Sequence, residues 1–315
     1  MGPPSIGGFN ENLTPIDCDK PYPVRFGHAS NLGRDPCRLP KWSKVIRDAH
    51  SGQGLASVGP LTLKTNTLLP VTITPLLLPE LAPTGHLRAS LNIANTILAH
   101  SNTEAAKPAG VTIDLSRELA RRLGVAVEFL EWDAPGESLR ALADGAGDVG
   151  YLAVDPKRAQ EVYFTFPYVQ IEACYLAKQE SALTHQSQVD QPGTEVLVMD
   201  TSAYDLFLTR HLQHATLVRL PAEEVFPALR EDRTGRRVAA GIKQALLAEI
   251  QGASGFRLLD GCFLAIQQAM VLPSKSSAAA RSAIRAFLAE MISTGFIAES
   301  LERHQISGAT VLSAP

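Results

Sequence analysis

The residues best suited to chemistry lie in one stretch, residues 147–178. Within it, Arg158 follows an apolar run and the predicted helix N-cap Asp155. Ligands of open α/β sheets collect at the carboxyl ends of strands, and an arginine held there can bind an anionic group through two parallel hydrogen bonds. Because the first turn of a helix favours an anion, Arg158 predicts an anionic ligand shared between its guanidinium and the free amides. The alternative is an exposed arginine that pairs with Glu161.

Polar residues also end other predicted strands. Thr201 and Ser202 follow a strand of the second half of the chain, and their hydroxyls and nearby amides could form an anion site that faces Arg158 across a cleft. Helix capping is the simpler explanation of both residues. Asn92 and Asn95 end the first strand, where they would either bond a ligand or serve as turn residues. The candidate ligand-binding residues are therefore Arg158, Asp155, Thr201, Ser202, Asn92 and Asn95.

Motifs of common catalytic and cofactor sites are missing from the sequence, which contains no GxSxG, HExxH, Walker loop or GxGxxG. The eight histidines are scattered, and the four cysteines show no metal-binding spacing. We therefore predict no catalytic residue, no metal and no cofactor. Cys174 and Cys262 fall on two segments expected to cross between the halves of the chain. They would either form a disulfide in an oxidising compartment or stay two buried thiols.

The composition excludes two classes of partner. The chain has 315 residues and a formal net charge of -3, which offers no concentrated basic face for nucleic acid. Its apolar runs are broken by proline, glycine or charge before they reach the roughly 20 residues that a membrane-spanning helix needs. The first residues also lack the basic and apolar regions of a signal peptide. We expect no nucleic-acid partner and no membrane span.

Two similar α/β halves are predicted around the candidate residues. In the first half, a helix places three leucines on one face and Arg121 and Arg122 on the other, and Gly124 suits its C-cap. Strands and helices that alternate with short connections imply a parallel sheet with right-handed crossovers. The predicted elements of this half are Leu87 to Ile93, Ile113 to Leu123, Val125 to Leu130, Glu137 to Ala143 and Asp148 to Val154.

The same alternation repeats after an extended run from Val169 to Ala177. A second extended run, Cys262 to Leu272, follows the second half, and two helices close the chain. Two α/β halves joined by two crossing segments are typical of a hinge that closes on a ligand. The predicted elements are Glu195 to Met199, Ala203 to Leu212, Thr216 to Leu220, Ala222 to Arg230, Arg237 to Ala240, Ile242 to Ile250, Phe256 to Leu259, and the closing helices Ser276 to Ile292 and Phe296 to His304.

The N-terminal quarter of the chain differs from the rest. Twelve of the 21 prolines lie in residues 1–83, and each proline removes a backbone donor and biases its predecessor away from helix. We predict an irregular, loosely attached segment there. Residues 84–172 with 261–306 form the predicted first lobe, residues 173–260 the second lobe and residues 307–315 a tail. The fold class is α/β, with a mostly parallel sheet flanked by helices in each lobe and two hinge strands between the lobes.

Several segments resemble a known family. They are GHLRASLNIAN, AGVTIDLSRELARRLGVAVEFLEW, LADGAGDVGYLAVDPKRAQEVYFTFPYV, VMDTSAYDLFL and AIQQAMVLPSK. In this order they resemble the family 3 extracellular solute-binding proteins, which are type 2 periplasmic receptors of ABC importers for amino acids and related compounds. The resemblance covers about residues 84–306, and DPKR followed by FTFPYV is its most specific part.

The resemblance implies roles for matched positions. Arg158 matches the arginine that binds a ligand carboxylate, Asp155 stands where a threonine is usual, and Thr201 matches the hydroxyl residue at the second-lobe helix start. Two departures concern the ligand: residues 95–98 lack the aromatic groups that stack on it, and residues 241–243 lack the acid that holds its ammonium. Because an unpaired ammonium in a closed cleft costs several kcal/mol, these departures favour a carboxylate or another small anion over a plain amino acid.

Our functional hypothesis is a non-catalytic, monomeric solute-binding protein for ABC-type import. It would capture a small polar or anionic solute, an amino acid or related carboxylate, and deliver it to an ABC permease. The alternatives are an enzyme on the same scaffold, such as a cyclic-acid dehydratase, and a sensory ligand-binding domain. The resemblance implies a periplasmic or extracellular location, whereas the N-terminus as written carries no export signal.

Overall fold

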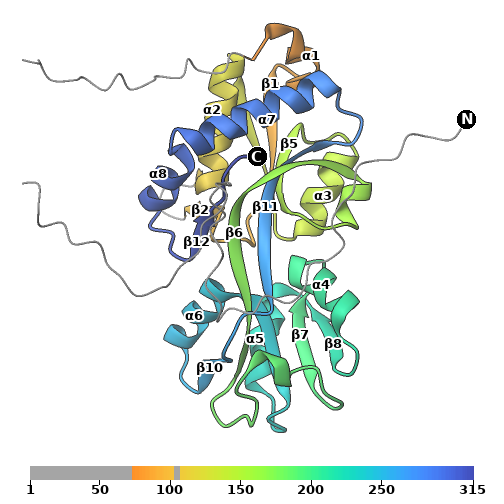
Figure 1. Cartoon of the computed structure of the whole chain (residues 1–315), viewed down its shortest axis with the longest axis vertical. Helices are drawn as coiled ribbons and strands as arrows, with labels where there is room; N and C mark the ends of the chain where they lie inside the picture. Colours follow the sequence, from red (N-terminus) through yellow and green to blue (C-terminus); the bar gives the residue numbers. More distant parts are fainter. Residues whose placement is uncertain (1–72, 103–106) are drawn as a thin grey trace, which may run out of the picture. The chain divides into compact units, whose positions relative to one another are not determined.

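The longest strand, β6, runs unbroken over Val162–Lys178 in the computed structural model, which describes residues 73–102 and 107–315. Its sequence is rich in the β-branched and aromatic residues that favour strands. Strand β11 (Leu264–Pro273) pairs with it antiparallel, and the register shifts next to the pair Pro167–Ala269. A bulge of this kind accommodates a proline inside a sheet. Figure 1 shows β6 and β11 side by side, joining the upper and lower groups of elements.

The first lobe is built on three strands in the order β4-β1-β5, of which β1 pairs parallel with both neighbours. Gly124 ends helix α2 in the left-handed conformation that suits glycine, with φ 70°. Helices α7 and α8 return to this lobe at the end of the chain, as Figure 1 shows. The bounds are β1 His86–Asn92, α2 Val111–Leu123, β4 Ala126–Trp132, α3 Pro135–Ala143, β5 Val149–Ala153, α7 Ala278–Ser293 and α8 Phe296–Arg303.

The second lobe repeats this arrangement with the parallel order β9-β7-β8. Its strands continue the same sheet, whose full order is β4-β1-β5-β11-β6-β9-β7-β8, with β10 paired to β6. The fold is therefore the predicted two-lobed α/β fold. The bounds are β7 Glu195–Met199, α4 Ala203–His211, β8 Thr216–Leu220, α5 Ala222–Arg230, β9 Arg237–Ile242, α6 Lys243–Gly252 and β10 Phe256–Leu258.

Two terminal predictions were wrong in part. The end of the segment predicted as irregular forms helices η1 (Pro75–Leu77) and α1 (Leu78–Leu81), and their buried leucines pack into the first-lobe core. The rest of that prediction, residues 1–72, lies outside the described residues. The predicted tail contains strand β12 (Ala309–Val311), which pairs antiparallel with β6. Short elements absent from the prediction are β2 His100–Asn102, β3 Lys107–Ala109 and η3 Gln186–Gln188. The predicted helical turn at Arg158 is the 3₁₀ helix η2 (Arg158–Gln160), whose N-cap is Lys157 rather than the predicted Asp155.

A buried ion-pair network corrects one helix prediction. Arg122 was placed on the open face of α2, yet its side chain is only 9% exposed. Its guanidinium bonds both carboxylate oxygens of Glu290 on α7, at 2.7 and 2.8 Å, and also contacts Glu118 at 2.8 Å. Helix α7 therefore covers part of the face that the periodicity of α2 alone assigns to solvent. None of the helices in the described ranges is long and apolar enough to cross a membrane.

Candidate functional site

Four parallel strands end around one cavity of about 200 Å³. Asn92, Ala153, Met199 and Ile242 are the last residues of β1, β5, β7 and β9, and all four line it. The first two strands belong to the first lobe and the others to the second, so the cavity lies between the lobes, as expected for the carboxyl edge of an α/β sheet. Its other lining residues include Asn95, Arg158, Ser202, Tyr204, Val225, Phe226, Gly241, Leu246 and Gln268.

Arg158 lies at the first-lobe side of this cavity and is 3% exposed. Its Nη1 donates a hydrogen bond of 3.0 Å to the Ala153 carbonyl, and its Nη2 donates one of 2.8 Å to the Thr201 carbonyl of the second lobe. Burial disfavours the charged form and lowers the pKa of Arg158 to about 10, against a smaller opposing effect of Asp155. The guanidinium is thus a buried cation held by neutral oxygens, unlike the exposed arginine considered as the alternative.

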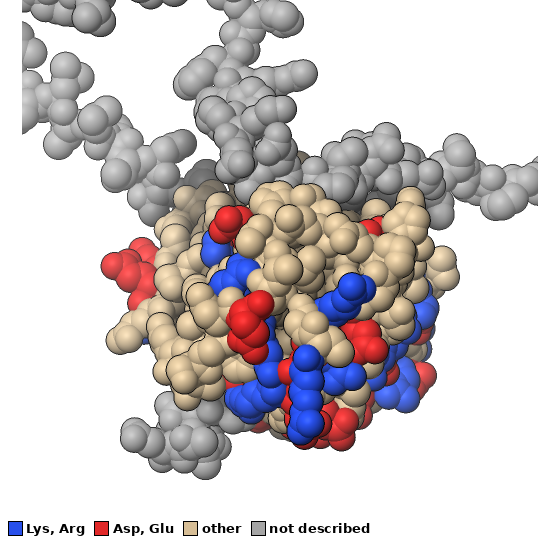
Figure 2. Space-filling view, turned by 90° about the horizontal axis from the view of Figure 1, so that it is seen from below, with Lys and Arg blue, Asp and Glu red and all other residues tan. Residues whose placement is uncertain are grey.

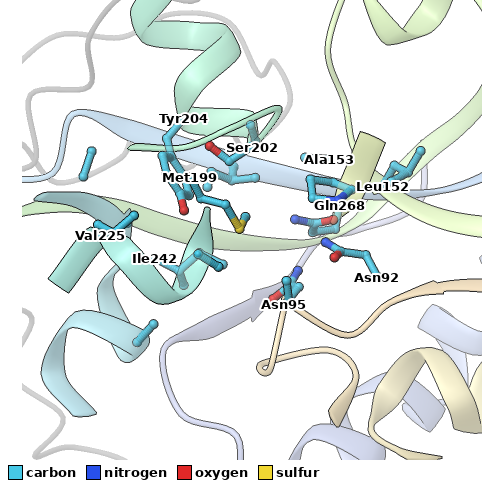
Figure 3. A pocket seen from close by; sticks show the side chains of 18 of the residues that line it. Asn92, Asn95, Leu152, Ala153, Met199, Ser202, Tyr204, Val225, Ile242 and Gln268 are labelled. Carbon is cyan, nitrogen blue, oxygen red and sulfur yellow. The ribbon is translucent and has the colours of Figure 1, made fainter. Parts of the chain in front are cut away.

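Three amide side chains approach the cavity beside Arg158. The Oδ1 atoms of Asn92 and Asn95 are buried and have no hydrogen-bond partner within the described residues. Gln268 comes from hinge strand β11 and is 4% exposed. Figure 3 shows Asn92, Asn95 and Gln268 at one side of the pocket, with Met199, Tyr204 and Val225 at the other. Gln268 is not among the predicted site residues, although two adjacent glutamines in an otherwise apolar run were a signal.

Only one residue of the predicted Thr201-Ser202 anion turn reaches the cavity. Ser202 lines it, but the Ser202 hydroxyl accepts a 3.0 Å hydrogen bond from the Asp205 amide and so caps α4. Thr201 does not line it; its φ is 59°, and its hydroxyl donates to the Asp200 carbonyl at 2.7 Å. The Thr201 carbonyl, not its hydroxyl, contacts Arg158.

Asp155 is buried but points away from the cavity that Arg158 lines. Its carboxylate accepts a 2.8 Å hydrogen bond from the Lys157 amide and another of 2.8 Å from Arg210 on α4. The aspartate therefore shapes the turn that carries Arg158 and contacts the second lobe through Arg210. Of the six candidate residues, Arg158, Asn92, Asn95 and Ser202 line the cavity, and Asp155 and Thr201 support its edge.

The second-lobe wall of the cavity is mainly apolar, apart from Ser202 and Tyr204. Gly241 and Ile242, which occupy the place where the resemblance leads one to expect an acid, both line it. Lys243 instead pairs with Glu172 at 2.7 Å and is not among the lining residues. Among the described residues, no Asp or Glu lines this cavity, and no group of three or more His, Cys, Asp and Glu side chains is arranged to hold a metal. The wall suits an uncharged ligand body.

A cavity between the strand ends of two α/β lobes, with a buried cation at one side, defines a two-lobed ligand-binding protein. The model of the bacterial extracellular solute-binding proteins, family 3, matches residues 97–305. The chain belongs to this family, whose members bind solutes outside the cytoplasm. No curated protein matches the sequence.

Solved structures with the same fold are similar to this chain at low identity. A mutant arginine-binding protein from T. maritima is 18% identical with a TM-score of 0.61, covering 72% of this chain and 97% of that one. An ancestral amino-acid-binding protein, a precursor of cyclohexadienyl dehydratase, is 20% identical with a TM-score of 0.60. The match covers 72% of this chain and 98% of that one. A putative ABC-transporter binding component from Wolinella succinogenes, complexed with lysine, is 17% identical with a TM-score of 0.60. The match covers 70% of this chain and 95% of that one.

Proposed function

We propose that the protein captures a small carboxylic acid with an uncharged body and delivers it to an ABC permease. One observation carries the proposal: a buried arginine faces a cavity whose described lining contains no acidic side chain. The cation calls for an anionic partner, and the remaining lining offers no charged partner for a second, positive group. A carboxylate without an ammonium fits both conditions.

The carboxylate would bind Arg158. Its hydrogen bonds to the Ala153 and Thr201 carbonyls use two of the five N–H donors that a guanidinium carries, so donors remain for a ligand. Carbonyl oxygens give hydrogen bonds but no compensating charge, and Asp155 offsets only part of the cost of burying the cation. A ligand carboxylate would supply that charge in a geometry that guanidinium groups bind well.

The rest of the ligand would be uncharged but able to form hydrogen bonds. The buried oxygens of Asn92 and Asn95 suit a hydroxyl or amide donor, and Gln268 adds a group that both donates and accepts. Opposite them, Met199, Val225 and other apolar side chains suit a hydrocarbon body. A volume of about 200 Å³ suits small metabolites, since pockets for drug-sized molecules start at about 300 Å³. A larger, more open pocket shares Ala94, Met199 and Ala222 with this cavity. A 2-hydroxy acid is the simplest ligand of this kind.

We further propose that the protein acts outside the cytoplasmic membrane as a monomer and without catalysis. Family membership and the ABC-transporter origin of the Wolinella succinogenes relative support an importer as partner. No His, Asp or Glu of the described chain stands beside Arg158 in the cavity lining, and proton transfer by such a group is the usual basis of catalysis on small acids. This favours binding over the dehydratase-like alternative.

The test is a thermal-shift and calorimetric comparison of matched ligands. Pairs of 2-hydroxy acids and 2-amino acids with the same carbon skeleton are compared, with the amide of each hydroxy acid as a third ligand. We expect the hydroxy acid to bind at least about tenfold more tightly than its amino-acid partner, because an unpaired ammonium in a closed site costs several kcal/mol. The amide, which has no carboxylate, should not bind measurably.

Two variants serve as controls. Arg158→Gln should weaken the best ligand by about a hundredfold or more, whereas Arg236→Gln, which changes an exposed arginine outside the cavity lining, should leave the affinity unchanged. Tighter binding of the amino acids, or unchanged affinity in Arg158→Gln, would refute the proposal. Loss of the bound acid from the NMR spectrum on incubation would show turnover and favour an enzyme.

A further inference from the structure

Two cysteines meet where the hinge segments enter the second lobe. The Sγ atoms of Cys174, on β6, and Cys262, two residues before β11, lie 2.7 Å apart. The sequence alone allows either a disulfide or two buried thiols for this pair. Both cysteines are free thiols in the structure, and their sulfur atoms are within hydrogen-bonding distance.

Backbone hydrogen bonds hold both cysteines in register. The Phe263 amide donates to the Ala173 carbonyl at 3.1 Å, and the Leu259 amide donates to the Tyr175 carbonyl at 2.9 Å. Cys174 and Cys262 therefore lie between two fixed contacts of the same two segments. A disulfide needs a sulfur–sulfur distance of about 2.05 Å, so bond formation requires an approach of less than about 1 Å. The stacked rings of Tyr175 and Phe263, 4.2 Å apart, fix the same junction.

The surroundings of the pair suit a structural bond better than a reactive or metal-binding thiol. Cys174 is 2% and Cys262 8% exposed, and both pack in the second-lobe core with Leu176, Leu246 and Phe256. The hydrogen bond with Cys174 and burial raise the pKa of Cys262, whereas nucleophilic and metal-binding cysteines need a lowered pKa. No third His, Cys, Asp or Glu of the described residues joins the pair in a metal-binding group.

We propose that Cys174 and Cys262 form a disulfide that covalently closes the base of the second lobe. The two residues are 88 positions apart, and all of β7, β8, β9 and β10 with α4, α5 and α6 lies between them. A cross-link around so long a loop stabilises a fold by restricting the unfolded chain. The bond would fix β6 to the segment before β11, so the hinge would bend only on its first-lobe side.

The bond forms by thiol–disulfide exchange with a small disulfide such as oxidised glutathione. The thiolate of one cysteine attacks a glutathione sulfur, giving a mixed disulfide and one reduced glutathione. The second cysteine then attacks the protein sulfur of that mixed disulfide and releases the second reduced glutathione. Two electrons and two protons pass from the protein thiols to the glutathione pair. Because the folded thiols are buried, exchange takes place during folding or transient opening.

The test uses the full chain with Cys18→Ser and Cys37→Ser, so that only the pair remains. The protein is incubated with oxidised glutathione, with and without mild denaturant, then unfolded and alkylated. We expect a mass lower by two hydrogens and no alkylation, and two alkyl groups after prior reduction. Adding Cys174→Ser should instead leave Cys262 alkylated or glutathionylated. Alkylation or glutathionylation of both cysteines in both incubations would overturn the proposal.

Two further measurements report on the closed lobe. Cleavage by trypsin at exposed Arg233, between α5 and β9, should leave the fragments as one band on a non-reducing denaturing gel and separate them after reduction. A reductant should lower the melting temperature of the oxidised protein by roughly 5 °C or more. The melting temperature of the double variant Cys174→Ala, Cys262→Ala should not change. Separation of the fragments without reductant would contradict the cross-link. The same change in melting temperature with reductant in the oxidised protein and in the double alanine variant would also contradict it.

Discussion

The first lobe buries cations, whereas the second lobe keeps its cations near the surface. Arg158 and the Arg122 network lie inside the first lobe. Within residues 173–260, all of which are described, no Lys or Arg is buried. Figure 2 looks onto the second-lobe end of the molecule and shows Lys and Arg interspersed with Asp and Glu. Ion pairs of the second lobe include Arg237–Glu195, whose side chains are 35% and 41% exposed.

The same contrast divides the cavity, where the first lobe and β11 supply Arg158, Asn92, Asn95 and Gln268 and the second lobe supplies mainly apolar groups. Under the proposed function, chemical recognition of the ligand would be concentrated on one lobe, and the other would contribute mainly shape and exclusion of water. Polar groups surrounded by an apolar cover interact more strongly than in water. Under the proposed function, selectivity for charge would therefore reside in the first lobe.

The largest expected effect is on stability. Arg122→Met leaves the Glu290 carboxylate buried without its main partner, which should lower the free energy of unfolding by about 3 kcal/mol. Arg237→Met breaks the comparable pair with Glu195 in the second lobe. Because these two charges are half-exposed, the free energy of unfolding should fall by less than about 1 kcal/mol. Urea denaturation of the two variants measures both values. Equal losses would remove the distinction between the lobes.

A smaller effect is expected from adding an acid to the second-lobe wall. Ile242 lines the cavity opposite the asparagines, so Ile242→Asp places a carboxylate where the lobe has none. The preference for a 2-hydroxy acid over the matched 2-amino acid should fall by about tenfold, because the ammonium gains a charged partner. Ile242→Asn is the control for polarity without charge. An unchanged ratio of the two affinities, measured by calorimetry, would argue that the ammonium position lies elsewhere.

The smallest effect concerns acid sensitivity. The hydrogen bond from Arg121, with help from Arg122, lowers the pKa of Glu118 from 4.5 to about 2. A carboxylate with a lowered folded pKa contributes stability above pH 4.5 and loses it as the pH falls toward 2. Glu118→Gln should therefore reduce the stability by about 1 kcal/mol at pH 6 and flatten its decline over this acidic window. The free energy of unfolding is measured by urea denaturation at several pH values. Parallel plots of this free energy against pH for the variant and the parent protein would contradict this role.

Features encoded by local sequence were predicted well. The bounds of β7, β8 and α5 agree with the structure, because short apolar runs and nearby capping or proline residues mark them. Arg158 was found in the same way, since a strand end followed by a helix start is a local pattern. Its partners were not, because the Thr201 carbonyl lies 43 residues away and its position depends on how the lobes meet.

Features that depend on distant contacts were missed. Gln268 enters the cavity because β11 inserts between β5 and β6, a pairing that periodicity cannot reveal. Arg122 is buried by Glu290, 168 residues further along the chain. Strand β12 has only three residues and owes its existence to the free edge of β6. In each case tertiary packing overrides what the local pattern indicates.

That edge of β6 changes partner at Glu172. Residues 169–171 pair with β12, and residues 173–177 pair with β9 of the second lobe. The Gln244 side chain of α6 also donates a 3.0 Å hydrogen bond to the Ser307 carbonyl just before β12. Any rotation of one lobe against the other must therefore flex a three-stranded ribbon and strain this contact. Strand β12 therefore stiffens the hinge. A chain that ends before Ala309 should have a more flexible hinge and an unchanged cavity.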